Sequence, residues 1–152
     1  MKLWQKSADS LESVTRFTAG ADARMDEFLI RHDLVGSMAH IIMLEKVGLL
    51  TAGELQRLLT ELRSLHKTAT DGAFHMEQGV EDIHSQVELE LTRRLGDDGK
   101  KIHSGRSRND QVLVDLKLFL REELQSTVNQ INEVFGLMLD LSDKHRAVLL
   151  PG

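Results

Sequence analysis

Cysteine is absent from this chain of 152 residues, so it contains neither a disulfide framework nor a thiolate metal site. Proline occurs only once, at Pro151, so the rest of the chain carries no residue that must interrupt a helix. No apolar run is long enough to cross a membrane, and the first residues lack the apolar core of a signal peptide. We therefore expect a cytoplasmic protein with no membrane-bound segment.

The chain also lacks an excess of positive charge. Its formal net charge is −5, which argues against bulk binding to nucleic acid. Residues 93–108 are the exception, with a local balance of +4 that leaves −9 for the rest of the chain. The basic residues of this segment are Arg93, Arg94, Lys100, Lys101, Arg106 and Arg108. Such a segment suits either a small anionic ligand or a solvated loop.

The seven histidines do not follow a metal-binding pattern. His32 and His40 are eight residues apart, and His75 and His84 are nine apart, whereas two zinc-binding histidines on one helical face are typically about four apart. The chain has no cysteine to complete a site. Glycine motifs that bind phosphates or dinucleotides are absent as well. The sequence thus predicts no metal site.

Apolar residues recur at helical spacing in the first half of the chain. A helix is expected from Ala21 to Gly48, with a close helix contact at Gly36 in its middle. A second helix should open with the capping box of residues 51–54, Thr-Ala-Gly-Glu, and continue to about Thr70. Residues 1–20 show no clear period and are predicted to form an extended arm.

A third helix is predicted to begin with Glu81 and Asp82, since acidic side chains suit the positive end of a helix. Gly96 should end it, and the Gly-Asp-Asp-Gly segment of residues 96–99 is typical of a loop. No segment has the alternating pattern of a strand. The sequence therefore predicts an all-α fold.

The last predicted helix is the longest, from about Asn109 to Arg146. At 1.5 Å per residue it would span roughly 57 Å. It is apolar on several sides, so it needs neighbours on several sides, and the shorter helices cannot cover its length. We expect short helices packed at the base of this long spine helix, a domain boundary between residues 1–108 and 109–152, and self-association through the exposed part.

The polar segment His103–Gln111 leads into the long helix. The first N–H groups of a helix lack partners within it and carry partial positive charge, which suits an anion. Arginine adds a bidentate grip on a carboxylate or phosphate, and Gly105 allows close approach of the backbone. The alternative is that Ser107 or Asn109 caps the helix and the arginines are solvated.

Residues 104–111, Ser-Gly-Arg-Ser-Arg-Asn-Asp-Gln, resemble a motif of the argininosuccinate lyase family of the aspartase/fumarase superfamily. Three further stretches agree with the same family in the same order. Lys2-Leu3-Trp4 resembles its start, residues 33–50 resemble its first long helix, and Glu81-Asp82-Ile83-His84 resembles its second characteristic element. The resemblance covers nearly the whole chain and implies the helical fold of that superfamily.

The resemblance also implies a reaction, the elimination of fumarate from argininosuccinate to leave arginine. A base removes a proton beside a carboxylate, an enediolate-like dianion develops, and the leaving guanidinium group is protonated. Developing negative charge needs preorganised hydrogen-bond donors. Arg108 and Asn109 match family residues that hold the substrate.

Four further residues take roles from the resemblance. Arg106 and Ser107 shape or support the substrate-binding loop, and Asp82 and His84 match a pair that lies near the family's site. No cofactor is implied. The family's enzymes are homotetramers whose sites combine residues from several subunits.

The chain departs from the family in three places. Gln5-Lys6-Ser7 stands where the family has a Gly-Gly-Arg-Phe segment, and Thr18 offers the only hydroxyl where a substrate-contacting serine is usual. Family members are also much longer, and their acid–base residues follow beyond Gly152. We therefore expect an N-terminal portion of the lyase that is inactive alone.

Two alternatives remain from the sequence. The family includes lens crystallins, so a non-catalytic helical association module is one of them. An RNA-binding module that uses the basic segment 93–108 is the other, although His103 is the only aromatic ring near it for base stacking.

Overall fold

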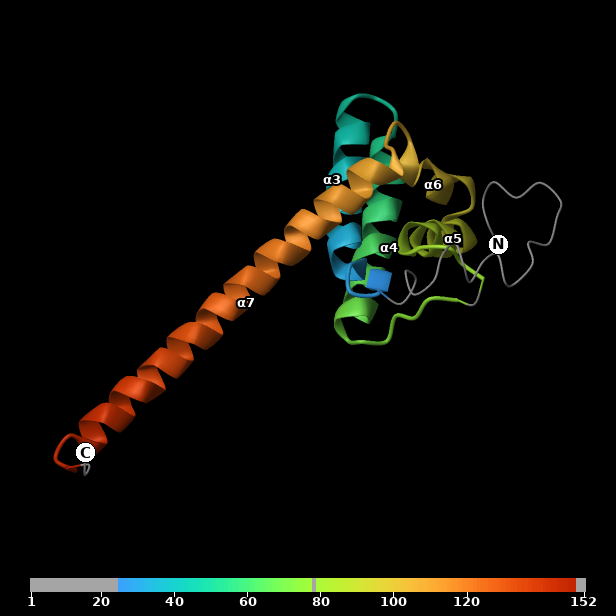
Figure 1. Ribbon diagram of the computed structural model, residues 1–152. Helices are drawn as coiled ribbons and strands as arrows, with labels where there is room; N and C mark the ends of the chain where they lie inside the picture. Colours follow the sequence, from blue (N-terminus) through green and yellow to red (C-terminus); the bar gives the residue numbers. More distant parts are fainter. Residues whose placement is uncertain (1–24, 78, 150–152) are drawn as a thin grey trace. The chain divides into compact units, whose positions relative to one another are not determined.

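The computed structural model describes residues 25–77 and 79–149, and Figure 1 shows their arrangement. The regular elements in this part of the chain are all helical, which confirms the predicted all-α fold. They are α3 (Ile30–Lys46), α4 (Ala52–Thr70), α5 (Ile83–Leu95), α6 (Asp97–Lys100), the 3-10 helix η1 (Lys101–His103) and α7 (Arg108–His145). The predicted arm of residues 1–20, with Thr18, lies outside the described residues.

The structure divides into two compact units, of which the first ends at Lys117 and the second begins at Leu118. The division falls within α7, because Gln111 and Asp115 on its first turns are buried in the first unit. The domain boundary that we expect between residues 108 and 109 stays a prediction.

The core of the first unit lies between α3, α4 and α5. α3 packs along α4, and α5 contacts both helices. α4 turns an apolar face to the core, since Leu58, Leu62 and Leu65 are buried and Leu55 and Leu59 pack against the core. The other buried apolar side chains are Ile30, Leu34, Ile41, Leu44, Leu50, Ile83, Val87, Leu91 and Ile102. Among the described helices, none is both long and apolar enough to span a membrane.

The first predicted helix is interrupted near its beginning. Residues 25 and 26 are helical, residues 27–29 form a turn, and α3 starts at Ile30, so a continuous helix from Ala21 is wrong. The N–H groups of Phe28 and Leu29 bond to carbonyls three residues back, at 3.2 and 2.8 Å, which is the tighter 3-10 pattern.

α4 begins as its sequence predicts. The Thr51 hydroxyl accepts a hydrogen bond from the Glu54 N–H at 3.3 Å, and the Glu54 carboxylate accepts one from the Thr51 N–H at 2.7 Å. This reciprocal arrangement satisfies two backbone donors that the helix leaves free. Lys101 also donates to Glu54, and chiefly for that reason the pKa of Glu54 falls to about 2. The cap of α4 is thereby linked to η1.

α5 also starts and ends where the sequence indicates. Asp82 is the N-cap and accepts a hydrogen bond from the Ser85 N–H at 2.8 Å. Gly96 follows the helix with a φ of 62°, a conformation that favours glycine. The predicted loop at residues 96–99 is wrong, however, because Asp97–Lys100 forms the short helix α6. Gly99 makes this possible, since its bare backbone lies directly on that of α5.

Replacing Gly99 with alanine should destabilise the first unit. An added Cβ would lie 2.4 Å from the Leu91 carbonyl carbon and 2.5 Å from the Thr92 nitrogen, and these backbone atoms cannot move aside independently. We expect Gly99→Ala to lower the free energy of unfolding by about 2–3 kcal/mol, as overpacking does. Urea titration followed by circular dichroism measures it. Gly53→Ala is the control, because its Cβ meets only the Arg57 side chain at 3.6 Å. Equal stability of the two variants would contradict this packing.

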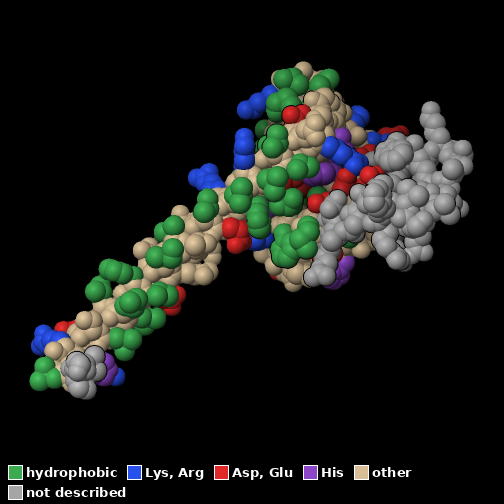
Figure 2. Space-filling view, viewed as in Figure 1, with side chains coloured by type: hydrophobic (Ala, Val, Ile, Leu, Met, Phe, Trp, Pro, Cys, Tyr) green, Lys and Arg blue, Asp and Glu red, His purple; other side chains and the backbone are tan. Residues whose placement is uncertain are grey.

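α7 agrees with the predicted long helix to within one residue at each end. The expected close contact at Gly36 is confirmed, since a Cβ there would lie 3.4 Å from Val114 and 3.6 Å from the Asp115 carboxylate. In the second unit, α7 exposes many large apolar side chains, visible along the helix in Figure 2. They include Leu120, Leu124, Val128, Ile131, Val134, Phe135, Leu137, Met138, Leu139 and Leu141.

Candidate functional site

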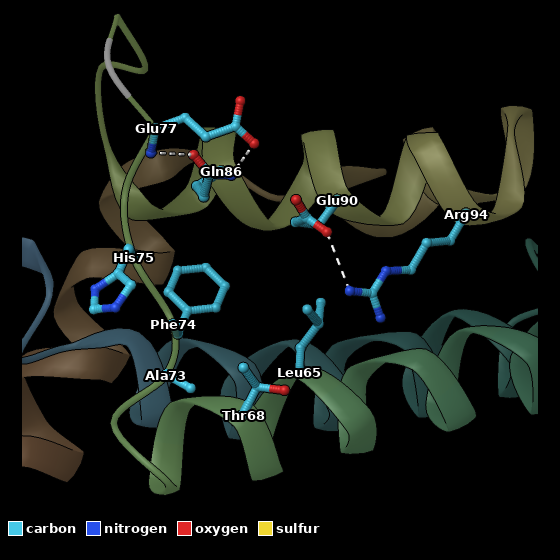
Figure 3. A pocket seen from close by; sticks show the side chains of 9 residues that line it. All are labelled: Leu65, Thr68, Ala73, Phe74, His75, Glu77, Gln86, Glu90 and Arg94. Atoms are coloured by element: carbon cyan, nitrogen blue, oxygen red, sulfur yellow. Dashed lines mark hydrogen bonds and ion pairs between the residues drawn. The ribbon is translucent and has the colours of Figure 1, made fainter.

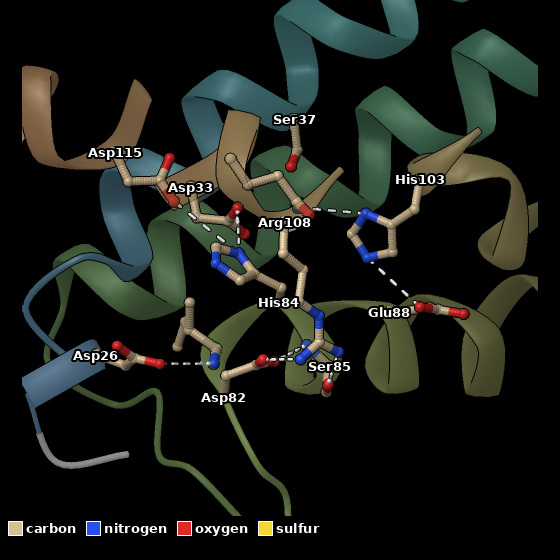
Figure 4. Close-up of polar contacts among 12 residues, drawn as sticks. Asp26, Asp33, Ser37, Asp82, His84, Ser85, Glu88, His103, Arg108 and Asp115 are labelled. Atoms are coloured by element: carbon tan, nitrogen blue, oxygen red, sulfur yellow. Dashed lines mark hydrogen bonds and ion pairs between the residues drawn. The ribbon is translucent and has the colours of Figure 1, made fainter. Parts of the chain in front are cut away.

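The predicted residue His84 lies in a buried polar cluster with two carboxylates (Figure 4). His84 Nδ1 is 2.9 Å from Asp33 Oδ1 on α3 and 3.9 Å from Asp115 Oδ2 on α7. The side chain of His84 is 4 % exposed and those of the two aspartates are 1 % exposed. Neither aspartate was singled out by the sequence. We call Asp33, His84 and Asp115 the buried triad.

The buried triad carries unusual proton affinities. Burial, reinforced by the charge of Asp33, raises the pKa of Asp115 to about 7. For His84, burial alone would lower the pKa, but the hydrogen bond and charge of Asp33, with the charges of Asp82 and Asp115, raise it overall. The environment of the buried triad therefore favours protonation of both His84 and Asp115 relative to the same groups in water.

The segment that leads into α7 is fastened to α3 at two points. The His40 imidazole donates from Nε2 to the Ser104 carbonyl at 2.9 Å, and the Arg106 guanidinium donates to the Ser37 hydroxyl at 2.9 Å. Gly105 lies between them with a φ of 69°, a left-handed conformation that is costly for other residues. Arg106 is half-buried and directed to the interior, so it holds the loop in place.

Arg108 is held by the first turn of α5 (Figure 4). Its guanidinium pairs with Asp82 Oδ2 and donates to the Ser85 hydroxyl at 2.8 Å. Asp82 uses its other oxygen to cap α5, so one carboxylate both starts that helix and orients the arginine. Because 42 % of the Arg108 side chain is exposed, the guanidinium still faces solvent.

Ser107 and Asn109 lie exposed at the start of α7. The Ser107 N–H donates to the Asp110 carboxylate at 3.1 Å, so Asp110 satisfies one donor of the helix start. In the part of the chain that the structure describes, no hydrogen bond engages the Ser107 hydroxyl or the Asn109 side chain. Ser107 occupies the N-cap position of α7, since its carbonyl accepts the first helical hydrogen bond from the Gln111 N–H, but its hydroxyl makes no capping hydrogen bond. The alternative in which these side chains only cap the helix stays open.

The basic residues of segment 93–108 are not a free positive patch. Arg93 and Arg94 pair with glutamates of the 77–90 region and of α4, Lys100 pairs with Asp97 at 2.7 Å, and Lys101 pairs with Glu54. With Arg106 directed to Ser37 and Arg108 paired with Asp82, each cation has a partner. Anion binding would have to use the oriented donors at the start of α7, because the other cationic side chains of this segment are engaged by their own partners.

His103 also lies beside this loop, but its pKa is lowered, whereas the pKa of His84 is raised. The Gln111 amide donates to its Nδ1 at 3.2 Å, and its Nε2 lies 3.4 Å from Glu88. Burial, with the nearby charge of Arg106, lowers the pKa of His103 to about 4. The ring is therefore neutral at physiological pH and acts as an acceptor for Gln111, which extends the polar contacts to α7.

The buried triad has the side chains of a metal site, since one ligand-type atom from each member lies within 4.8 Å of the others. Histidine spacing could not reveal this set, because its members come from three separate helices. The positive charge of Arg106 acts on both carboxylates, which opposes a further cation there. The absence of a metal stays a prediction.

A pocket of about 280 Å³ lies elsewhere on the first unit, between α4, the loop after it and α5 (Figure 3). The charged residues of its lining are paired with neighbouring lining residues, Glu90 with Arg94 and Glu77 with Gln86. None of the residues 106–109 lines it, so this pocket is separate from the candidate site.

Comparison with known proteins identifies the family of the chain. A family model described as lyase matches residues 5–152. The chain belongs to this lyase family. It is 56 % identical over 151 residues to the argininosuccinate lyase of Phocaeicola vulgatus. The matched residues make up 99 % of this chain and 34 % of that protein.

More distant members of the lyase family show the same relation. The argininosuccinate lyase of Desulfitobacterium hafniense is 41 % identical over 156 residues, 100 % of this chain and 33 % of that protein. That of Azotobacter vinelandii is 40 % identical over 139 residues, 91 % of this chain and 30 % of that protein. The chain thus spans about a third of the length of these relatives.

Sequence reasoning missed the residues that support the loop from α3 and α7. Asp33 and Ser37 are four residues apart, as are Gln111 and Asp115, and all four are buried. Polar residues at this spacing share one face of a helix. Each pair lies on the buried side of its own helix. Two polar residues on the same side as the apolar residues of a helix would have indicated a buried polar contact.

Proposed function

We propose that the chain is the substrate-anion-binding part of an enzyme that cleaves argininosuccinate to arginine and fumarate. The observation that carries the proposal is the start of α7, where Ser107 and Asn109 are exposed and uncommitted beside an arginine already oriented by its neighbours. The names of the relatives supply the substrate. Their sequences match nearly all of this chain at 40–56 % identity.

The geometry suits the charge that develops during the elimination. An enediolate-like dianion needs donors that are in place before the reaction and need no rearrangement. Arg108 is held by Asp82 and Ser85, and Asn109 adds a neutral amide donor at the positive end of α7. Arg106 holds the backbone of the loop through Ser37. Asp82 and His84 support the site without reaching the substrate.

A titration of the 152-residue chain tests the proposal. Fumarate or succinate should shift the backbone amide resonances of residues 107–111 in NMR spectra, with millimolar affinity, about −4 kcal/mol. Asn109→Ala should abolish the shifts. Asn132→Ala, at another exposed asparagine of α7, should leave them unchanged. Equal shifts in both variants would exclude Asn109 from the anion site.

We also propose that α7 associates with further copies of the chain, as the part of a homotetramer that the family resemblance implies. The exposed apolar side chains of residues 118–141 form a larger patch than monomeric proteins usually leave in water. The absence of a membrane-spanning helix among the described residues is consistent with a cytoplasmic enzyme.

Sedimentation velocity at tens of micromolar should show the wild-type chain as oligomers. Leu124→Glu combined with Phe135→Glu should shift it to monomers, because both side chains are more than half exposed in the single chain and would carry unpaired charge into an interface. Val47→Glu, equally exposed on the first unit, is the control. A wild-type chain that sediments as a clean monomer would contradict the proposal.

The non-catalytic association module is less well supported than the enzyme. The relatives reported above are all named as argininosuccinate lyases, and association alone requires neither the exposed Asn109 nor an arginine oriented by Asp82.

A further inference from the structure

The buried triad joins three helices that are distant in the sequence. Asp33 comes from α3, His84 from the first turn of α5 and Asp115 from the second turn of α7. Asp33 Oδ2 and Asp115 Oδ2 are both buried and have no hydrogen-bond partner within the described residues. Two buried carboxylate oxygens without donors are costly if both groups are ionised.

The charges around the triad show how this cost is met. Two ionised carboxylates beside the same imidazole nitrogen, His84 Nδ1, repel each other, and a single proton placed on one of them removes the repulsion. We propose that Asp33 and Asp115 are positioning residues, that the buried carboxyl of Asp115 carries a proton below neutral pH, and that this proton holds α7, His84 and Arg106 in register with α3 and α5.

A proton fits the triad better than a divalent cation does. Arg106 is half-buried beside the two carboxylates and already supplies a positive charge. His84 Nδ1 lies at hydrogen-bonding distance from Asp33 Oδ1, and an Nδ1 that donates to this oxygen has no lone pair for a metal. A metal ligand must be deprotonated, so cation binding would break that contact.

The ionisable groups near Asp115 act on its pKa in opposing directions. Asp33 on α3 and Asp26 before it raise the pKa of Asp115, whereas His84 on α5 and Arg106 on the loop lower it. Burial is the largest influence, and the sum favours the neutral acid up to about pH 7. Asp82 acts on His84 and not on Asp115.

The proton has a structural consequence for the loop at residues 104–109. Arg106 bonds to Ser37, one helical turn beyond Asp33, and Asp115 lies on the same face of α7 as Gln111, which bonds to His103. When Asp115 ionises, a negative charge appears in a buried contact that ties α7 to α3, and the anchoring of the loop weakens. The anchoring of the loop by Asp115 does not depend on which ligand the loop binds.

The test compares the pH dependence of unfolding in the 152-residue chain and in Asp115→Asn. Asparagine keeps the shape of the neutral acid but cannot ionise. The folded pKa of Asp115 is raised, so its contribution to stability is complete below the unfolded pKa and is lost as pH rises through about 7. The ratio of the wild-type to the variant folding constant should therefore fall on the order of 10- to 10²-fold between about pH 5 and about pH 8.

Two companion measurements separate positioning from simple packing. In Asp115→Asn, the NMR resonance of the Arg106 Nε–H should stay where it is in the wild-type chain at pH 6, whereas Asp115→Ala should shift it or broaden it. The variants are compared at equal protein concentration, because association changes apparent stability. If Asp115→Ala fails to fold, the pH dependence of Asp115→Asn still decides.

Two results would overturn the proposal. A pH-independent stability ratio, or one that rises with pH, would mean that the Asp115 carboxyl does not carry the proposed proton in the folded chain. Stabilisation of the wild-type chain by Zn²⁺ or Mn²⁺, absent in Asp115→Asn, would mean that the triad holds a metal ion.

Discussion

Argininosuccinate added to the purified 152-residue chain should remain uncleaved. Elimination needs a base for the carbon-bound proton and an acid for the leaving nitrogen, each within hydrogen-bond reach. His84 is buried against Asp33, and His103 is a neutral ring that accepts a hydrogen bond from Gln111. Neither is free to exchange protons with a substrate at the exposed start of α7. The family resemblance places the acid–base groups in sequence beyond Gly152.

The measurement is fumarate absorbance at high protein concentration, over hours. The expected rate equals that of the buffer alone, which is a loss of the whole enzymatic acceleration, typically 10⁶-fold or more. A known argininosuccinate lyase serves as positive control. Turnover that co-purifies with the chain and disappears in His84→Asn would show that this segment is a minimal lyase.

The second large effect concerns Asn109 in a lyase of full family length that carries this segment. Its side chain is exposed and has no partner among the described residues, so Asn109→Ala should change the free energy of unfolding by no more than about 0.5 kcal/mol. If it binds the developing dianion, kcat/KM should fall on the order of 10²-fold, or about 3 kcal/mol. Steady-state kinetics and urea unfolding of the same preparations measure the two quantities.

Arg108→Ala should lower kcat/KM by a similar factor but should also release Asp82 and Ser85, so a moderate loss of stability is expected with it. Arg63→Ala, at an exposed arginine of α4, is the matched control and should be neutral in both assays. Unchanged kinetics in Asn109→Ala would remove this residue from the site.

The helices were predictable because their signals are local. Each helix-end signal joins residues within a single turn. The examples are the capping box at Thr51, the N-cap at Asp82 and the glycine stop at Gly96. The loop predicted at residues 96–99 was wrong for a different reason. Glycine there serves close packing of α6 on α5, and a contact between two helices cannot be read from turn propensity.

The candidate site was predictable only in part, for the same reason. The motif of residues 104–111 and the Asp82–His84 element stand out in the sequence through family resemblance. The partners on α3 do not. Asp33 and Ser37 are identified only by their contacts with His84 and Arg106, which follow much later in the chain. Their neighbours along α3 are mostly apolar and predict only an amphipathic helix.

The sequence separations of these contacts bear on when the site forms during synthesis. His84 and Asp33 are 51 residues apart, Ser104 and His40 are 64 apart, and Arg106 and Ser37 are 69 apart. α3 and α4 are joined by a short connection and can pair as soon as both have been translated, whereas long-range contacts form later because the chain must close larger loops. Until Asp115 leaves the ribosome, the nascent chain holds Asp33 and His84 without their third partner. The loop at residues 104–109 is therefore among the last parts of the first unit to become ordered.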